Sequence, residues 1–375
     1  MSEGKKNTMK TTVLCFIVLA VLAGFASDAI AGAGNRGGTS GASELLIPVG
    51  ARDIALGGST IATTRDIEAL YWNPAAVAHM RSSASVYVSH MSYIADIGIN
   101  YGAVAGNFEG FGVLSLSLKS LDVGEILVTT TTDPDGTGKT FSPQFFTVGL
   151  TYSRLLNDRI AVGLTTKIIS ERMGDVSAAG VAFDIGVTYD NLASVDGLSM
   201  GVAVKNVGPS MTFDGTGLLT AATVEAQHRP AGLYQVQAAP FELPSAIEFG
   251  IGYKRGIDDA NTVLLSGAFQ SNNFSDDEYR LGMEYSYQDM FFVRGGYNFA
   301  QQETDERQFL FGAAFGAGVK YALGNTDITV DYAYRSVDVF DANHVFSVKL
   351  GFWPGNTNSR SPPGGEDREE KAKPL

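Results

Sequence analysis

The chain has 375 residues and carries 27 Lys and Arg against 40 Asp and Glu, which gives a formal net charge of −13. This acidic balance argues against nucleic acid as a partner, because phosphate backbones are bound by basic surfaces. After residue 31 no run of about 20 apolar residues occurs, so we expect no membrane-spanning helix.

Residues 1–31 have the pattern of a cleaved export signal. Lysines precede an apolar run at residues 13–22, and the small-x-small sequence of residues 29–31 suits cleavage. A retained membrane anchor is the alternative, but the apolar run is short for a spanning helix. Cleavage would remove Cys15, the only cysteine, so we expect no disulfide and no thiol chemistry in the mature chain. Export without disulfides leaves a soluble periplasmic β-protein or an outer-membrane barrel.

Residues 32–82 lack the alternation of a β-strand. Residues 49–59 and 66–70 have the pattern of short helical or irregular pieces. Asn73 is a good helix N-cap and Pro74 suits the first helical position, so we expect a short helix to begin there. The segment is rich in Ala, Gly, Leu and Tyr and has few charges. That composition fits a plug packed against the inner wall of a barrel.

Residues 83–353 show the period-two alternation of β-strands. Within residues 278–287, one face carries only Leu, Met and Tyr, whereas the other carries charged, small or hydroxyl side chains. An even number of such strands can close an antiparallel barrel. The predicted strands are residues 84–92, 95–107, 110–121, 143–155, 158–171, 178–190, 198–207, 244–256, 261–271, 276–287, 291–299, 307–321, 326–337 and 343–353.

Alternation alone also fits a soluble β-sandwich, whose outer face is polar. The predicted strands are about 10–14 residues long and their apolar faces end in aromatic residues, as in strands that cross a bilayer. We therefore predict an all-β fold: a transmembrane antiparallel barrel of about 14 strands, with residues 32–82 as a helical hatch inside its lumen. Residues 354–375 are rich in Pro, Gly and charge, and we expect a disordered periplasmic tail.

Charged residues on the polar strand faces are expected to point into the lumen. If the turn after Tyr287 has three residues, Glu284 faces Arg294 directly across the hairpin, and Arg280 faces Asn298. A structural ion pair is the ordinary role of such residues, and a substrate contact is the alternative. The predicted lumen charges are Lys167, Asp184, Glu248, Glu284, Arg294, Asp331 and Arg335.

Two predicted connections are much longer than the others. Residues 122–142 are polar and rich in turn residues, whereas residues 208–243 carry many apolar side chains. A loop of that length and composition is expected to pack against something, either the mouth of its own barrel or a partner. The candidate partner-binding residues are Phe213, Leu218, Leu219, Leu233, Tyr234 and Phe241.

Two stretches, residues 50–58 (GARDIALGG) and 69–75 (ALYWNPA), resemble the N-terminal signature of the PorV/PorQ family. That family is similar to FadL-type channels for hydrophobic compounds, which share the Asn-Pro-Ala element. The resemblance implies a 14-stranded barrel in the outer membrane of a Gram-negative bacterium, with its N-terminal segment folded inside as a hatch. We expect Tyr71 and Trp72 to anchor this hatch against the inner wall. The hatch-motif residues are Arg52, Gly57, Gly58, Tyr71, Trp72, Asn73, Pro74 and Ala75.

The sequence contains no motif for catalysis or cofactor binding. Gly-x-Ser-x-Gly, P-loop and His-Glu-x-x-His patterns are missing, and no histidine lies at metal-ligand spacing from another ligand. We therefore expect a non-enzymatic protein without cofactor or metal. The histidines are His79, His90, His228 and His344.

Three functional hypotheses remain. The family resemblance implies type IX protein secretion and surface attachment of cargo, with outer-membrane lipid, secretion-system components and cargo as partners. The second hypothesis is a FadL-like channel for uptake of a hydrophobic ligand. The third is an outer-membrane lipid hydrolase that uses His90 or His344.

Overall fold

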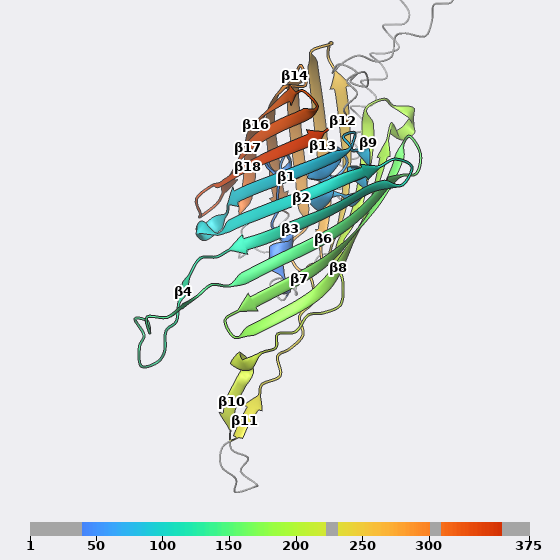
Figure 1. Ribbon diagram of the computed structural model, residues 1–375. Coiled ribbons are helices and arrows are strands. Elements are labelled where there is room, and N and C mark those ends of the chain that lie inside the picture. Colours follow the sequence, from blue (N-terminus) through green and yellow to red (C-terminus); the bar gives the residue numbers. More distant parts are fainter. Residues whose placement is uncertain (1–39, 223–231, 301–308, 355–375) are drawn as a thin grey trace, which may run out of the picture.

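Fourteen antiparallel strands close into a barrel in the computed structural model, which describes residues 40–222, 232–300 and 309–354 (Figure 1). The predicted signal at residues 1–31 and nearly all of the predicted tail lie outside the described residues. The barrel strands are β1 (Ala84–Ser92), β2 (Gly98–Phe108), β3 (Gly112–Asp122), β6 (Gln144–Leu155), β7 (Ile160–Met173), β8 (Val176–Asp190), β9 (Leu198–Val207), β12 (Ala246–Gly256), β13 (Asn261–Asn272), β14 (Glu278–Tyr287), β15 (Phe291–Ala300), β16 (Phe311–Leu323), β17 (Thr326–Val337) and β18 (Asn343–Phe352).

Barrel strands that follow one another along the chain pair as neighbours, and β1 closes the ring against β18. At this seam Ala84 lies opposite Phe352, and Ser92 lies opposite His344. The predicted number of strands is confirmed, and most of the predicted limits lie within two residues of the observed ones. Strand β2 begins three residues later than predicted, because a 3₁₀ turn, η4 (Ile94–Asp96), precedes it.

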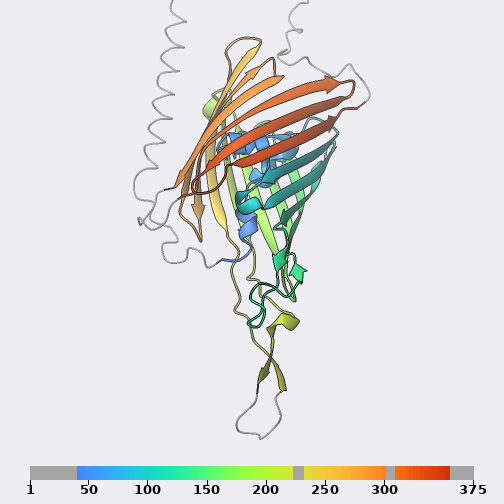
Figure 2. The same ribbon diagram turned by 90° about the vertical axis from the view of Figure 1, so that its left-hand side faces the viewer.

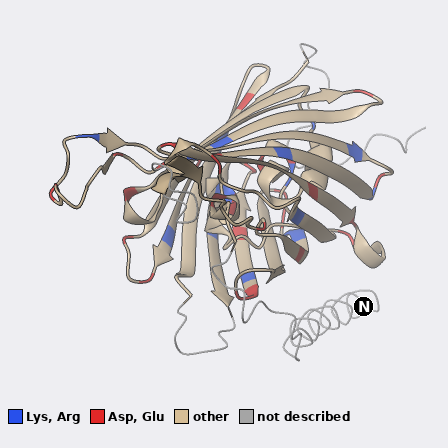
Figure 3. Cartoon of the chain, turned by 90° about the horizontal axis from the view of Figure 1, so that it is seen from below, with Lys and Arg blue, Asp and Glu red and all other residues tan. Residues whose placement is uncertain are grey.

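The faces of the strands alternate as the sequence predicts. On β3 the outward Leu116 is 50 % exposed, whereas the inward Ser115 is 3 % exposed. A view from one end shows charged residues within the ring and on the loops (Figure 3). The outward faces of the barrel are therefore apolar and many inward side chains are polar, although Tyr87, Met91 and Ile99 are buried in an apolar cluster with the N-terminal segment.

The connections differ at the two ends of the barrel. At one end, here called the short-turn end, strands are joined by residues 109–111, 156–159, 257–260, 288–290 and 324–325, with one longer link at 191–197. At the opposite long-loop end, two connections project beyond the barrel (Figure 1). They contain β4 (Ile126–Leu127) with β5 (Thr140–Phe141), and the short helix η6 (Thr216–Leu218) with the β10 (Leu219–Ala222) and β11 (Gly232–Gln235) hairpin.

Residues 40–83 form the N-terminal segment, which consists of short helices and turns. Helix η3 (Pro74–His79) contacts β6, β7 and β8, whereas helix α2 (Ala51–Ala55) contacts β15, β16, β17 and β18. Because these strands lie in different parts of the ring, the segment lies among the inward faces of the barrel (Figure 2). Its other helices are η1 (Ser43–Leu46), η2 (Asp66–Glu68) and α3 (Ala69–Trp72). Among the described residues no helix combines the length and apolarity needed to cross a membrane.

Candidate functional site

The Asn73-Pro74 turn joins the N-terminal segment to the barrel wall. As predicted, Asn73 caps η3: its side-chain oxygen accepts a hydrogen bond from the Ala75 amide at 3.1 Å. The Asn73 amide nitrogen also donates to the carbonyl of Val187 on β8, at 3.3 Å. Ser153 on β6 donates to the Pro74 carbonyl at 2.5 Å. The buried Asn73 side chain therefore bonds both to its own helix and to β8, and the Pro74 carbonyl adds the bond to β6.

Glycines allow the backbone of the segment to touch the backbone of the wall. Gly57 and Gly58 have φ angles of +66° and +74°, where residues with a side chain are strained. A Cβ on Gly57 would lie 2.8 Å from the amide nitrogen of Tyr297 on β15. Conversely, a Cβ on Gly296 would lie 2.8 Å from the Cα of Gly57 and closer still to its nitrogen. No side chain fits at this contact from either partner.

Tyr71 and Trp72 hold distant parts of the N-terminal segment together. The Trp72 ring is 2 % exposed, and its Nε1 donates to the Val49 carbonyl at 3.1 Å. The Tyr71 hydroxyl donates to the Leu46 carbonyl at 3.1 Å. Two wall lysines contact these rings. Lys205 Nζ on β9 lies 4.8 Å from the Tyr71 ring centroid and 5.5 Å from that of Trp72, and Lys119 Nζ on β3 lies 5.1 Å from that of Tyr71.

A chain of buried ion pairs crosses from the segment to the wall. Glu284 faces Arg294 in the predicted register, with Arg294 Nε 2.6 Å from the carboxylate. Arg294 continues to Asp331 on β17 at 2.5 Å. Arg52 of the segment reaches Glu284 from the other side at 3.1 Å. The sequence predicts the pair of Glu284 with Arg294 but not the contribution of Arg52, because the strand register carries no information on residues of the N-terminal segment.

Two further ion pairs attach the segment at the short-turn end. Lys349 on β18 lies 2.7 Å from the carboxylate of Glu68, and Arg65 lies 2.6 Å from Asp190 at the end of β8. Burial opposes the charge of Glu68, but Lys349 and Arg52 bring the pKa of its carboxyl below the ordinary value. The carboxylate is therefore held ionised between cations.

The N-terminal segment also contains two carboxyl groups that burial disfavours as anions. Burial, assisted by the nearby carboxylate of Glu171, raises the pKa of Glu44 to about 7. Burial likewise raises the pKa of Asp53 to about 7, against the opposing charge of Arg52. Glu44 lies at the long-loop end, where Lys119 donates to the carbonyls of Glu44 and Ile47 at 2.6 and 2.5 Å. Lys119 therefore binds backbone oxygens there, and Glu44 has no ion pair among the described residues.

The remaining predicted lumen charges lie nearer the long-loop end. Lys167 pairs with Asp184 at 2.6 Å, and Lys205, which the prediction omits, pairs with Glu248 at 2.9 Å. Arg335 is different, because its Nη2 donates to the neutral side chain of Asn343 at 2.7 Å. Within the described ranges it forms no ion pair with a carboxylate.

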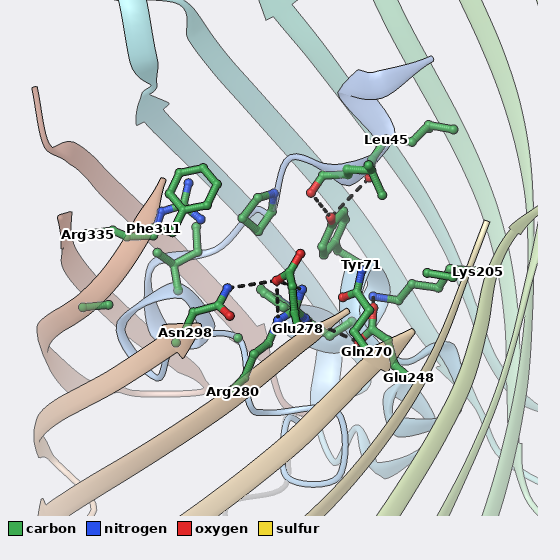
Figure 4. A pocket seen from close by; sticks show the side chains of 18 of the residues that line it. Leu45, Tyr71, Lys205, Glu248, Gln270, Glu278, Arg280, Asn298, Phe311 and Arg335 are labelled. Atoms are coloured by element: carbon green, nitrogen blue, oxygen red, sulfur yellow. Dashed lines mark hydrogen bonds and ion pairs between the residues drawn. The ribbon is translucent and has the colours of Figure 1, made fainter. Parts of the chain in front are cut away.

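Two cavities flank the segment. The larger, about 480 Å³, opens toward the short-turn end and is lined by the Arg52, Arg65, Glu68 and Lys349 attachments described above. The smaller, about 70 Å³, lies toward the long-loop end among Tyr71, Trp72 and the charged wall residues (Figure 4). Charged side chains line both cavities, so the part of the lumen that the N-terminal segment does not fill is polar.

The sequence matches the family described as type IX secretion system protein PorV over residues 31–226. This span covers more than half of the chain and includes the N-terminal segment and seven barrel strands. The chain belongs to the PorV family. None of the curated proteins compared with it matches.

Among solved structures, this PorV-family chain is similar to the CymD monoaromatic hydrocarbon channel, with a TM-score of 0.52 and 13 % identity over 83 % of this chain and 99 % of that one. A FadL homologue from Pseudomonas aeruginosa gives a TM-score of 0.49 at 13 % identity, over 82 % of this chain and 98 % of that one. At such identities the likeness to CymD establishes a common barrel fold.

The long loop of the PorV-family barrel has two parts that the sequence does not separate. Phe213 and Phe241 stack with ring centroids 5.3 Å apart and pack against a core cluster that includes Leu45. Leu233 and Tyr234 on the β10–β11 hairpin are 74 % and 46 % exposed. Leu219 on the same hairpin is exposed and Leu218 is half-buried. One part of the loop thus covers its own barrel mouth, and the other part is a free apolar surface.

Three of the four histidines lie among the described residues. His90 and His344 are exposed on strands and bond to Asn100 and Tyr332, each at 2.8 Å. His79 lies 3.6 Å from Asp190, and burial lowers the pKa of its imidazole to about 4. His228 lies outside the described residues. Among the described residues no cluster of His, Cys, Asp and Glu could hold a metal ion.

Proposed function

We propose that the chain is a non-enzymatic barrel of the Gram-negative outer membrane that acts in type IX secretion and in the surface attachment of cargo. The observation that carries this proposal is the match to PorV over residues 31–226, which takes in both the N-terminal segment and half of the barrel. In this proposal the export signal is cleaved after residue 31, and the short-turn end, where the described chain ends at residue 354, faces the periplasm.

The outer surface supports placement in a bilayer. Strands of 9 to 15 residues carry apolar outward faces, and tilted strands of about 9–11 residues suffice to cross a membrane. Burying such a surface in lipid removes its apolar area from water, at roughly 25 cal/mol per Å². Tyr297 and Phe299, at the long-loop end of β15, suit the aromatic girdle of one interface.

In this proposal the N-terminal segment is a hatch that keeps the lumen closed. Ion pairs fix it at Arg52, Arg65 and Glu68. At the contact of Gly57 with Gly296, no side chain fits between hatch and wall. A hydrophobic solute passing through the remaining cavities would have to desolvate these buried ions, which is costly. This polarity supports a secretion role over passage of apolar molecules along the axis.

The exposed hairpin supports a partner at the long-loop end. The β10–β11 hairpin projects beyond the barrel (Figure 2). Its side chains Leu219, Leu233 and Tyr234 are exposed. Exposed apolar groups gathered on a projecting arm are typical of protein interaction sites. In this proposal the arm contacts a secretion-system component or cargo outside the membrane.

A FadL-like channel for hydrophobic small molecules is the second candidate. The fold shared with a barrel titled a monoaromatic hydrocarbon channel favours it. The charged interior argues against an axial path, so such a channel would need the hatch to move.

Deletion of the gene separates the two candidates. Under the secretion proposal, cargo accumulates in the periplasm and the intact gene restores its surface attachment. Under the channel alternative, cargo is attached normally and uptake of an apolar aromatic compound falls. A variant with Leu219, Leu233 and Tyr234 changed to serine tests the arm, and the matched control changes Leu114, Leu116 and Leu118 on the lipid-facing side of β3 to alanine. Normal cargo attachment in the deletion strain would refute the secretion proposal.

A further inference from the structure

Arg335 is a buried cation that forms no ion pair with a carboxylate of the described residues. Its side chain lies on β17 with the residue 6 % exposed, and its guanidinium carbon is 3.9 Å from the Phe311 ring centroid. Its hydrogen bonds go to the neutral amide of Asn343. The other cations around the same cavity, Lys167, Lys205 and Arg280, each have a carboxylate partner.

The geometry of the neighbouring strand explains why Arg335 is unpaired. Arg335 pairs across the sheet with Ala314 on β16, and that strand also carries Gly312 on the same cavity. Neither residue has a charged side chain that could pair with Arg335. Glu278 on β14 lines the same cavity of about 70 Å³, but it is already bound by Arg280 at 2.8 Å and by Asn298 at 2.9 Å (Figure 4).

We propose that this cavity binds a carboxylate, with Arg335 as the receptor. An isolated charge is costly to bury, so a buried guanidinium without an anion is incomplete unless a ligand supplies one. The planar fork of Arg matches a carboxylate with two parallel hydrogen bonds. Glu248 and Glu278 on the same wall disfavour a ligand with more than one negative charge.

The size of the cavity limits what it can hold. Pockets for whole drug-sized ligands measure about 300–1,000 Å³, so this one takes a carboxylate group or a very short carboxylic acid. Its lining by Leu45, Leu46 and Phe311 is apolar toward the long-loop end. A short free carboxylate and the head group of a longer apolar acid share this chemistry, and the experiment below distinguishes them.

Trp72 lines the same cavity and provides the signal for a test. The purified mature chain in detergent, with Trp353 changed to Phe, is titrated with sodium acetate against sodium chloride at constant ionic strength. We expect a saturable change in Trp72 emission with acetate and none with chloride. Decanoate is titrated in the same way: tighter binding than acetate identifies a longer acid, and equal binding identifies a short one.

Variants identify the receptor. Arg335→Gln should weaken acetate binding by about tenfold or more, and Arg335→Lys, which keeps the charge but loses the fork, should weaken it less. Lys320→Gln, which removes a cation at the short-turn end, is the matched control and should bind like the parent. Should Arg335→Gln fail to fold, the Lys variant decides. Parent-like binding by a folded Arg335→Gln variant, or by Arg335→Lys if the Gln variant does not fold, would overturn the proposal. The absence of a saturable response up to about 100 mM acetate would also overturn it, because a dissociation constant above that concentration is too weak for a specific site.

Discussion

Replacing Gly296 with alanine tests the direct contact between the N-terminal segment and the barrel wall. The added Cβ would lie 2.8 Å from the Gly57 Cα, whereas ordinary contacts begin at 3.4 Å. Both partners at this point are backbone, so no rotamer change can relieve the clash. The segment or β15 must move by more than about 0.6 Å, and overpacking of this kind costs about 1–3 kcal/mol.

Gly295 gives a control on the same strand. It points outward, and a Cβ there would meet only Phe315 at 3.8 Å, an ordinary contact. Gly295→Ala should therefore leave the free energy of unfolding within about 0.5 kcal/mol of the parent. Any general effect of alanine on β15 would appear in both variants.

Denaturant unfolding in detergent micelles measures the loss, and ion conductance in planar bilayers reports whether the lumen opens. We expect Gly296→Ala to lower the free energy of unfolding by about 1–3 kcal/mol and to raise conductance. If Gly296→Ala and Gly295→Ala behave alike in both assays, the close backbone contact with the wall is not what fixes the N-terminal segment in the barrel.

Three further predictions rest on single side chains. Burial raises the pKa of Glu44 from an ordinary 4.5 to about 7, so the protonated carboxyl favours the folded state. The stability that this provides is complete below about pH 4.5 and is lost as the pH rises through about 7. The unfolding midpoint of Glu44→Gln, measured against pH, should lack this dependence. Replacing Arg294 with Leu leaves Asp331 buried without its cation and should cost about 3 kcal/mol or more, and a double variant that also changes Asp331 to Leu should recover part of that loss. With Trp353 changed to Phe, the emission of Trp72 should be that of a buried indole, and emission typical of water-exposed tryptophan would contradict its packing.

Local pattern is enough to predict the barrel. Period-two alternation and turn length determine the strands, and the three-residue turn after Tyr287 determines that Glu284 faces Arg294. Small departures have local causes: β12 begins at Ala246 and not at residue 244, since Pro244 has no amide hydrogen for the ladder.

Contacts between distant segments could not be predicted in this way. The attachment of Arg52 to Glu284 spans 232 residues, and no strand register relates a residue of the N-terminal segment to a wall strand. Alternation places Arg335 in the lumen, but it does not show that Gly312 and Ala314 line the same cavity. In the long loop, Phe241 and Leu233 are both apolar in sequence, yet Phe241 is partly buried by packing against the cluster that includes Leu45, whereas Leu233 is exposed.

The path of the N-terminal segment restricts how the barrel can assemble. Gly41 bonds to Glu242 at one mouth, whereas Ser83 bonds to Phe352 at the other, so the segment runs from end to end before β1 begins. A ring that closed first would therefore have to admit the segment along its whole length before the contact of Gly57 with Gly296 could form.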